Sequence, residues 1–165
     1  MIVRKAIQKD KDQIKKIRPQ VVKFMANNNL TQWDDEYPSD EILMQDLDRG
    51  EMYVALIKNE VVGYVTINEE IPEEYNAISL EFSSKVCVHR LSVNPKFAKQ
   101  GIATKIMEHV HRDLKEQGYR AICLDTCEDN AGAIKLYSNL GYITRGYVIF
   151  ERRAPMKFPV MERKL

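Results

Sequence analysis

The fold is decided by residues 86–104, which read VCVHRLSVNPKFAKQGIAT. The first eight residues are mostly apolar and β-prone, and from Gly101 onward apolar residues recur at helical spacing. A strand therefore leads through a short basic loop into a helix. Because the first turn of a helix leaves backbone N–H groups without intrahelical partners, this junction predicts an anion site. Gly101 would permit a close approach of the anion, and Lys96 and Lys99 add positive charge.

Two common nucleotide-binding motifs do not fit this junction. A P-loop requires G-x-x-x-x-G-K-(S/T), but no glycine lies near position 96 and no Lys-Thr pair directly follows Gly101. A dinucleotide fingerprint requires three glycines at the first strand-to-helix turn, and here only Gly101 is present. A helix that merely begins with glycine remains the alternative interpretation.

The rest of the chain alternates between strand and helix patterns. A strand at residues 2–7 precedes a helix that Asp10 should cap, and Pro19 should kink or divide that helix. A second helix follows Ser39 and ends at Gly50. The remaining segments are strands at 52–57, 61–67, 86–93, 119–126, 142–150 and 158–162, and helices at 102–118 and 130–140.

This order of elements predicts an α+β fold in one domain spanning residues 1–165. We expect a central mixed sheet of about seven strands flanked by about four helices, because early hairpins are antiparallel and strands bridged by helices are parallel. No repeat, low-complexity tract or linker marks a second domain. A C-terminal strand exposed at the sheet edge would allow a homodimer.

Composition excludes several classes of protein. The chain has 25 basic and 24 acidic residues and a net charge of +1, so no global field favours nucleic acid or a membrane surface. No apolar run approaches the roughly 20 residues that span a bilayer, so we expect a cytoplasmic protein. Cys87, Cys123 and Cys127 are expected to be reduced structural thiols. Their spacing, even with His89, is not a usual zinc pattern, so no metal site is expected.

At the Gly101 junction the chain resembles the GNAT superfamily of N-acetyltransferases. The pyrophosphate loop of that family reads (R/Q)-x-x-G-x-(G/A) after a strand that ends in an L-x-V-like sequence. Here residues 91–93 read LSV and residues 98–103 read AKQGIA, so Gly101 and Ala103 match the family pattern. Ala98 departs from the pattern at the first position, where Lys99 or Gln100 can substitute for the missing polar side chain.

A second segment, residues 130–142, reads NAGAIKLYSNLGY and resembles the family pattern N-x-x-A-x-x-(L/F)-Y-x-x-x-G-(F/Y). Its key positions advance by three and then four, so Asn130, Ala133, Tyr137 and Gly141 share a helix face. The small Ala133 would leave space for a slender ligand. In the family, the Asn position often contacts pantetheine and the Tyr hydroxyl lies near the thioester sulfur. The alternative for Tyr137 is a partly buried core aromatic.

The resemblance implies an acetyl-CoA-dependent N-acetyltransferase that transfers acetyl to a primary amine by direct attack through a tetrahedral intermediate. Tyr137 would protonate the departing thiolate. The alternative is a non-catalytic acyl-CoA-binding regulatory module, which Ala98 keeps open. The residues implied in binding coenzyme A are Leu91, Ser92, Val93, Lys99, Gln100, Gly101, Ile102, Ala103, Thr104, Asn130, Ala133 and Tyr137.

The resemblance also suggests a base. Some family members place a histidine or carboxylate two or four residues before the Leu position, and strand alternation would put His89, Leu91 and Val93 on one face. His89 is therefore a candidate catalytic base, with a hydrogen-bonded structural histidine as the alternative and Glu81 as a weaker candidate.

The acceptor site would lie near the loop at residues 32–38, QWDDEYP, because family acceptor sites commonly follow the first helix. Trp33 and Tyr37 are candidate substrate residues, with ordinary surface packing as the alternative, and the three acidic residues favour a cationic amine. The acceptor is left open among small-molecule and peptide amines. His109 and His111 occupy successive helix positions, cannot share a face, and are expected at the surface.

Overall fold

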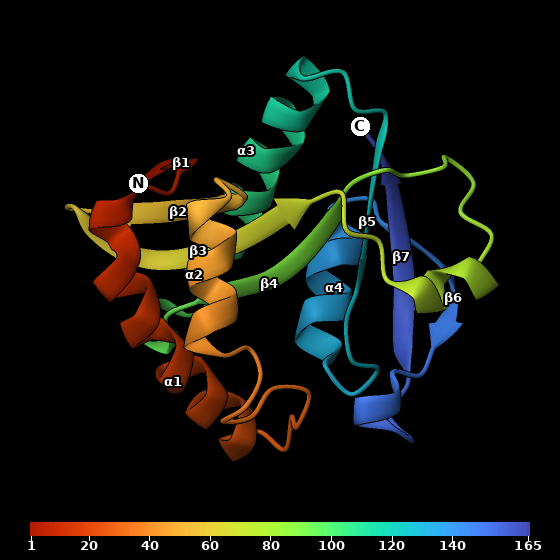
Figure 1. The fold of residues 1–165 in the computed structure, drawn as a ribbon, viewed down its shortest axis with the longest axis horizontal. Helices are drawn as coiled ribbons and strands as arrows, with labels where there is room; N and C mark the ends of the chain where they lie inside the picture. Colours follow the sequence, from red (N-terminus) through yellow and green to blue (C-terminus); the bar gives the residue numbers. More distant parts are fainter. The chain divides into compact units, whose positions relative to one another are not determined.

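The computed structural model describes all 165 residues, which divide into two compact units (Figure 1). Unit 1 comprises Met1–Ile67 and His89–Val110, and unit 2 comprises Asn68–Val88 and His111–Leu165. Strand β4 (Cys87–Val93) and helix α3 (Ile102–Glu116) each contribute residues to both units. The seven strands follow the order β1-β2-β3-β4-β5-β7-β6, which confirms the predicted mixed sheet.

Unit 1 begins with β1 (Ile2–Lys5), α1 (Lys11–Asn27) and α2 (Asp40–Asp48), followed by the antiparallel strands β2 (Met52–Ile57) and β3 (Glu60–Asn68). The predicted hairpin is confirmed. Its two connecting residues, Lys58 and Asn59, both have left-handed backbone conformations, with φ of 49° and 66°. Positive φ at both central positions suits the right-handed twist of the flanking strands.

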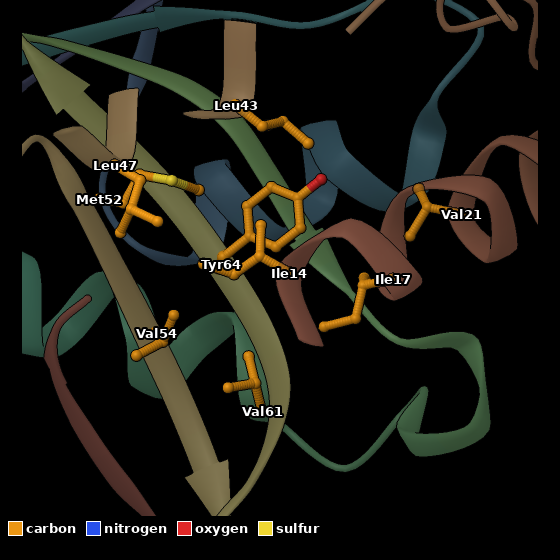
Figure 2. Close-up of a cluster of buried hydrophobic side chains, with 9 residues drawn as sticks. All are labelled: Ile14, Ile17, Val21, Leu43, Leu47, Met52, Val54, Val61 and Tyr64. Atoms are coloured by element: carbon orange, nitrogen blue, oxygen red, sulfur yellow. The ribbon is translucent and has the colours of Figure 1, made fainter. Parts of the chain in front are cut away.

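The core of unit 1 lies between its two helices and its hairpin. Figure 1 shows α1 and α2 side by side, and Figure 2 shows Tyr64 at the centre of the apolar side chains beneath them. Residues of α1 enter the core at spacings of three and four, which is the helical periodicity of the sequence. The buried cluster consists of Ile14, Ile17, Val21, Leu43, Leu47, Met52, Val54, Val61 and Tyr64.

Two expectations for the first helix need correction. Pro19 does not divide helix α1, which runs through it as one helix of 17 residues, because packing of its apolar face compensates for the missing backbone donor. The other expectation for Pro19, a kink, stays a prediction. Asp10 stands at the predicted N-cap position but does not cap the helix. Its carboxylate instead accepts hydrogen bonds from Arg4, at 2.7 and 2.9 Å, and from the backbone N–H of Ile7.

Unit 2 contains β5 (Ala121–Asp125), α4 (Ala131–Asn139), β6 (Ile143–Val148) and β7 (Phe158–Lys164), together with a 3₁₀ turn, η2 (Glu73–Ala77). Strands β4 and β5 are parallel, as predicted, and Cys87 stands opposite Cys123. Strand β7 lies between β5 and β6 and is antiparallel to both. The edge strand is therefore β6, not the C-terminal strand that we expected there.

The three thiols of unit 2 are free and buried, as expected for structural cysteines. They belong to one apolar cluster, and no group of three or more His, Cys, Asp or Glu side chains is arranged to hold a metal ion. None of the helices has the length and apolarity that crossing a membrane requires. The cluster consists of Tyr75, Cys87, Cys123, Cys127, Val148, Phe158 and Val160.

His111 is buried, which corrects the expectation of a surface residue. Its Nδ1 lies 2.6 Å from Arg163 Nη1 and its Nε2 lies 2.8 Å from Tyr142 Oη. Burial, assisted by the positive charge of Arg163, lowers the pKa of His111 to about 3. The imidazole is therefore neutral, and its Nδ1 accepts from the arginine while Nε2 carries the hydrogen.

Candidate active site

The junction between β4 and α3 has the predicted anion-binding geometry. A single 3₁₀ turn over Pro95–Phe97 follows the strand, and Lys99 and Gly101 then take left-handed conformations, with φ of 60° and 72°. The first helical hydrogen bond runs from Lys105 N to Gly101 O at 3.1 Å. The N–H groups of residues 102–104 precede that bond and have no acceptor within the helix.

Gly101 is required here for its backbone conformation. A side chain at this position would meet no protein atom within 4 Å, but the left-handed φ would strain any residue with a Cβ. The neighbouring Lys96, Lys99 and Gln100 are exposed. The turn therefore presents backbone N–H groups and cationic side chains to solvent on the same short segment.

The main chain of β4 is fixed against β3 within unit 1. Ser92 is buried, and a Cβ added at Gly63 would lie 2.8 Å from the Ser92 carbonyl oxygen and 3.1 Å from Ile106 Cδ1. Only glycine at position 63 permits this approach without displacing the strand. Leu91 and Val93, on either side of Ser92, are partly buried.

Arg90 interrupts the side-chain alternation that we expected along β4. Its φ is 56°, so the strand changes its local twist between His89 and Leu91, and strict alternation holds only on either side of Arg90. A left-handed non-glycine residue costs on the order of 1–3 kcal/mol and persists only where its surroundings hold it. Regular strand alternation was the basis for placing His89 and Leu91 on one face, and it does not apply across Arg90.

Asp46 of α2 holds Arg90 in this position. Arg90 donates to Asp46 through Nε at 2.8 Å and Nη2 at 2.9 Å, and Thr66 Oγ1 donates to the same carboxylate at 2.7 Å. Both charged side chains are at least nine-tenths buried. The ion pair was not predicted from the sequence, although an arginine within an apolar strand was an available signal.

Arg90 also contacts the candidate acceptor loop. Its Nη1 donates to Tyr37 Oη at 3.4 Å, and the ring of Tyr37 meets the ring of Trp33 edge-on with centroids 6.5 Å apart. Asp34 Oδ1 accepts from the backbone N–H groups of Glu36 and Tyr37. One acidic residue of the loop therefore shapes its backbone, and both aromatic residues are partly buried.

Helix α4 carries the second predicted group, in unit 2. Asn130 is its N-cap, and the Asn130 Oδ1 accepts from the backbone N–H of Ala133 at 3.0 Å. Tyr137 is buried, and its ring meets that of Tyr142 edge-on at 5.6 Å. Desolvation raises the pKa of Tyr137, so its hydroxyl keeps its proton at neutral pH. Gly141, with φ of 83°, follows the helix.

Asp125, at the end of β5, is a candidate that our interpretation of the sequence missed. Tyr75 Oη donates to Asp125 Oδ2 at 2.7 Å, and no basic side chain forms an ion pair with this carboxylate. The residue is partly exposed, yet burial of the carboxyl group is the largest cause that raises its pKa, to about 6. Its negative charge also raises the pKa of Tyr137. The available signal was a carboxylate ending an apolar strand, just before the Asn130 segment.

The two predicted candidates for a base have different surroundings. Glu81 is exposed and forms an ion pair with Arg145 at 2.7 Å. His89 is partly buried in β4, in unit 1. The predicted residues thus fall into a group from His89 to Thr104 in unit 1 and a group on α4 in unit 2.

Comparisons with solved structures show the same fold. An acetyltransferase of the GNAT family from Streptococcus agalactiae 2603 matches with a TM-score of 0.84 at 20% identity, over 99% of this chain and 95% of its own. A GNAT-family acetyltransferase from Listeria monocytogenes gives a TM-score of 0.77 at 18% identity, covering 99% and 94%. The ribosomal-protein-S18-alanine N-acetyltransferase of Escherichia coli gives 0.70 at 14% identity, covering 99% and 92%.

Sequence comparison agrees with the structures. The ribosomal protein bS18-alanine N-acetyltransferase of Escherichia coli K12 is 29% identical over 66 residues, which are 40% of this chain. The match spans 45% of that relative, less than half of its length. The profile of the family described as the acetyltransferase (GNAT) family matches residues 19–142. The chain belongs to the GNAT acetyltransferase family.

Proposed function

We propose that residues 1–165 act as one acetyl-CoA-dependent N-acetyltransferase domain whose acceptor is a primary amine of a small molecule or peptide. The observation that carries the proposal is the Gly101 turn, where left-handed backbone and unpaired helical N–H groups suit a pyrophosphate. Family membership supports the acetyl donor. The Escherichia coli relative, a ribosomal protein bS18-alanine N-acetyltransferase, supports an amine acceptor.

The binding of acetyl-CoA is proposed in two parts. The pyrophosphate would contact the segment Lys99–Thr104, where Lys99 and Gln100 supply the polar side chains that Ala98 lacks. The pantetheine arm would pair with the main chain of Leu91, Ser92 and Val93 like an added strand. Asn130 and Ala133 are proposed as further contacts to the arm, because the Asn130 amide nitrogen is not used by the N-cap bond.

The reaction needs no covalent enzyme intermediate. A neutral amine attacks the thioester carbonyl and forms the N–C bond, and a backbone N–H near Val93 stabilises the tetrahedral oxyanion. Collapse breaks the C–S bond, Tyr137 donates its proton to the departing thiolate, and a base removes the extra proton from nitrogen. The buried, protonated hydroxyl of Tyr137 supports its role as the acid.

Two residues are proposed as candidates for the base, and we favour Asp125 over His89. The carboxylate of Asp125 is fixed by a hydrogen bond of 2.7 Å and has a pKa raised to about 6, which suits proton transfer near neutral pH. His89 is kept as a candidate because of its position in β4, two residues before Leu91. Glu81 is not favoured, because its side chain is exposed and its carboxylate is engaged by Arg145 at 2.7 Å.

Acetyl transfer can be tested with the full chain, acetyl-CoA and a panel of amines that includes alanine-initiated peptides, amino acids and polyamines, with thiol release as the readout. Tyr137→Phe should lower kcat about a hundredfold or more while changing the KM for acetyl-CoA little. Tyr147→Phe, at an exposed tyrosine of β6, is the matched control. An unchanged kcat in Tyr137→Phe would remove this residue from the mechanism.

The docking site has its own test. Gly101→Glu should abolish acetyl-CoA binding in calorimetry, because it strains the turn and places a negative charge beside the N–H groups. Gly118→Glu is a matched control, since Gly118 also has a left-handed φ and open space around its Cα but follows the other end of α3. Tight binding by Gly101→Glu would contradict the assignment.

The alternative is a non-catalytic acyl-CoA-binding regulatory module, which the departure at Ala98 keeps open but which family membership does not favour. It predicts calorimetric binding of acetyl-CoA with no thiol release above the uncatalysed rate for any amine. The oligomeric state is proposed as a homodimer, supported by exposed Ile143 and Tyr147 on the edge strand β6. Sedimentation at micromolar concentration tests it.

A further inference from the structure

The segment between β3 and β4, residues 69–86, is fastened to unit 2 at several points. Tyr119 Oη donates to Glu69 at 2.6 Å near the start of the segment. In its middle, Ile78 lies so close to Gly146 that a Cβ at position 146 would be 2.5 Å from Ile78 Cδ1. These contacts keep a long irregular segment in a defined place, which is unusual for a loop of this length.

The strongest attachment is Glu162 of β7, which is fully buried. Its carboxylate accepts from Phe82 N at 3.1 Å, from Ser84 N at 3.3 Å and from Ser84 Oγ at 2.7 Å. Arg145 Nε donates to it at 3.2 Å and supplies the compensating charge. A buried carboxylate with this many donors holds the later part of the segment rigidly.

Tyr75 is the residue of this segment that reaches Asp125. It lies in the 3₁₀ turn η2, its side chain is 3% exposed, and its ring belongs to the apolar cluster of unit 2. Its hydroxyl donates to Asp125 Oδ2 at 2.7 Å. Since both the ring and the segment are held, the direction of the hydroxyl toward the carboxylate is fixed as well.

We propose that Tyr75 is a positioning residue for the reaction: its hydroxyl orients the Asp125 carboxylate and favours the ionised form that can accept a proton. This inference rests on the proposed function, in which Asp125 is the favoured base. It gives the segment 69–86 a role in the chemistry, through a residue that need not touch either substrate.

The surroundings of Asp125 make this hydrogen bond important. Burial favours the protonated acid, and the negative charge of Glu74 acts in the same direction, whereas the Tyr75 hydroxyl favours the carboxylate. The other titratable groups around the Tyr75–Asp125 pair are the thiols of Cys87 on β4 and Cys123 on β5 and the phenol of Tyr137 on α4.

The kinetic test compares the pH dependence of kcat/KM in wild type, Tyr75→Phe and Tyr119→Phe. Removing the Tyr75 donor should shift the acidic limb of the kcat/KM profile to higher pH by about one pH unit, because the Asp125 carboxylate loses a hydrogen bond. With a wild-type pKa of about 6 for Asp125, kcat/KM should fall about fivefold at pH 6 and change little at pH 8. Tyr119→Phe removes a comparable phenol–carboxylate bond from the same segment, at an exposed site, and should leave the limb in place.

A second measurement requires no substrate. The carboxyl carbon resonance of Asp125, assigned by its loss in Asp125→Asn, is titrated by NMR in the full chain. Its pKa should rise in Tyr75→Phe and fall slightly in Glu74→Gln, an exposed substitution that removes a repelling charge. If the Asp125 pKa shifts in opposite directions in these two neighbouring variants, a general loosening of η2 cannot be the cause.

The outcomes separate the two levels of the proposal. A raised Asp125 pKa together with a shifted acidic limb supports both the role of Tyr75 and the assignment of the base. If the Asp125 pKa rises but the acidic limb of the kcat/KM profile does not shift, Tyr75 does orient the carboxylate, and Asp125 is overturned as the base. An Asp125 pKa unchanged in Tyr75→Phe overturns the inference, whatever the kinetics show.

Discussion

Asp46 in unit 1 and Asp125 in unit 2 are both drawn away from solvent, but their partners differ in charge. Asp46 receives two hydrogen bonds from the Arg90 guanidinium and a third from Thr66. Asp125 receives one from the neutral hydroxyl of Tyr75. The ion pair gives Asp46 a structural partner, whereas the raised pKa of Asp125, about 6, suits proton exchange near neutral pH.

The two aspartates also differ in the parts of the protein that they hold in place. Asp46 keeps a left-handed arginine in β4 and, through it, a contact to Tyr37 in the candidate acceptor loop. The carboxylate of Asp125 has no such mechanical task and contacts the Tyr75 hydroxyl. We therefore expect substitutions of Asp46 to affect stability first and substitutions of Asp125 to affect turnover first.

The largest expected effect is on turnover. Asp125→Asn should lower kcat/KM by about 10²–10⁴-fold, the usual range for loss of a general base. Asp129→Asn, at an exposed carboxylate in the following loop, is the control. Equal activity of the two variants would return the role of base to His89, which His89→Gln then tests.

Asp46→Ala should lower the free energy of unfolding by about 3–5 kcal/mol, because it leaves the buried Arg90 charge without a counter-ion. Denaturant titration measures this loss. In a double-mutant cycle, adding Arg90→Ala should cost far less in the Asp46→Ala background than in wild type. If the losses in unfolding free energy from the two substitutions were additive, Asp46 and Arg90 would not be energetically coupled.

The pH dependence of stability provides a third test. The pKa of Asp125 is raised in the folded protein to about 6 from an ordinary value of 3.8, so its stabilising contribution is complete below about 3.8 and is lost as pH rises through 6. Between pH 4 and pH 7, wild type should therefore lose about 2 kcal/mol relative to Asp125→Asn. A constant difference between the two would show that Asp125 titrates normally.

The smallest expected effect concerns the acceptor loop. Tyr37→Phe removes the 3.4 Å hydrogen bond from Arg90 and keeps the ring contact with Trp33. The KM for the amine should rise about two- to threefold, with kcat and the KM for acetyl-CoA unchanged. Steady-state kinetics at varied amine concentration measures it, and a change confined to the KM for acetyl-CoA would contradict the loop's assignment.

Local patterns were sufficient to predict the elements and the two motif segments. Gly101 and Gly141 mark backbone reversals that only a few residue types adopt, and Asn130 caps the helix that its neighbours predict. The ion pair of Asp46 with Arg90 and the bond from Tyr75 to Asp125 were not predicted. Each joins residues 44 or 50 positions apart, and no periodicity in a single segment encodes such a pairing.

The topology shows the same limit. Parallel β4 and β5 follow from the crossover through α3, a connection with a strong preferred geometry. The insertion of β7 between β5 and β6 depends on which apolar faces meet after the last turn of the chain. His111 was misplaced for a related reason, since successive helix positions show that His109 and His111 face differently but not which one faces inward.

The bonds from Phe82 and Ser84 to Glu162 join residues 80 and 78 positions apart, which sets an order of events during synthesis. A growing chain emerges from the ribosome from its N-terminus, so residues 69–86 are exposed long before β7 exists. Until then the segment that carries Tyr75 lacks its strongest attachment, the carboxylate of Glu162. The surroundings of Asp125 are thus completed only with the last strand, and a chain interrupted before β7 would carry every residue of the proposed reaction without the support for its base.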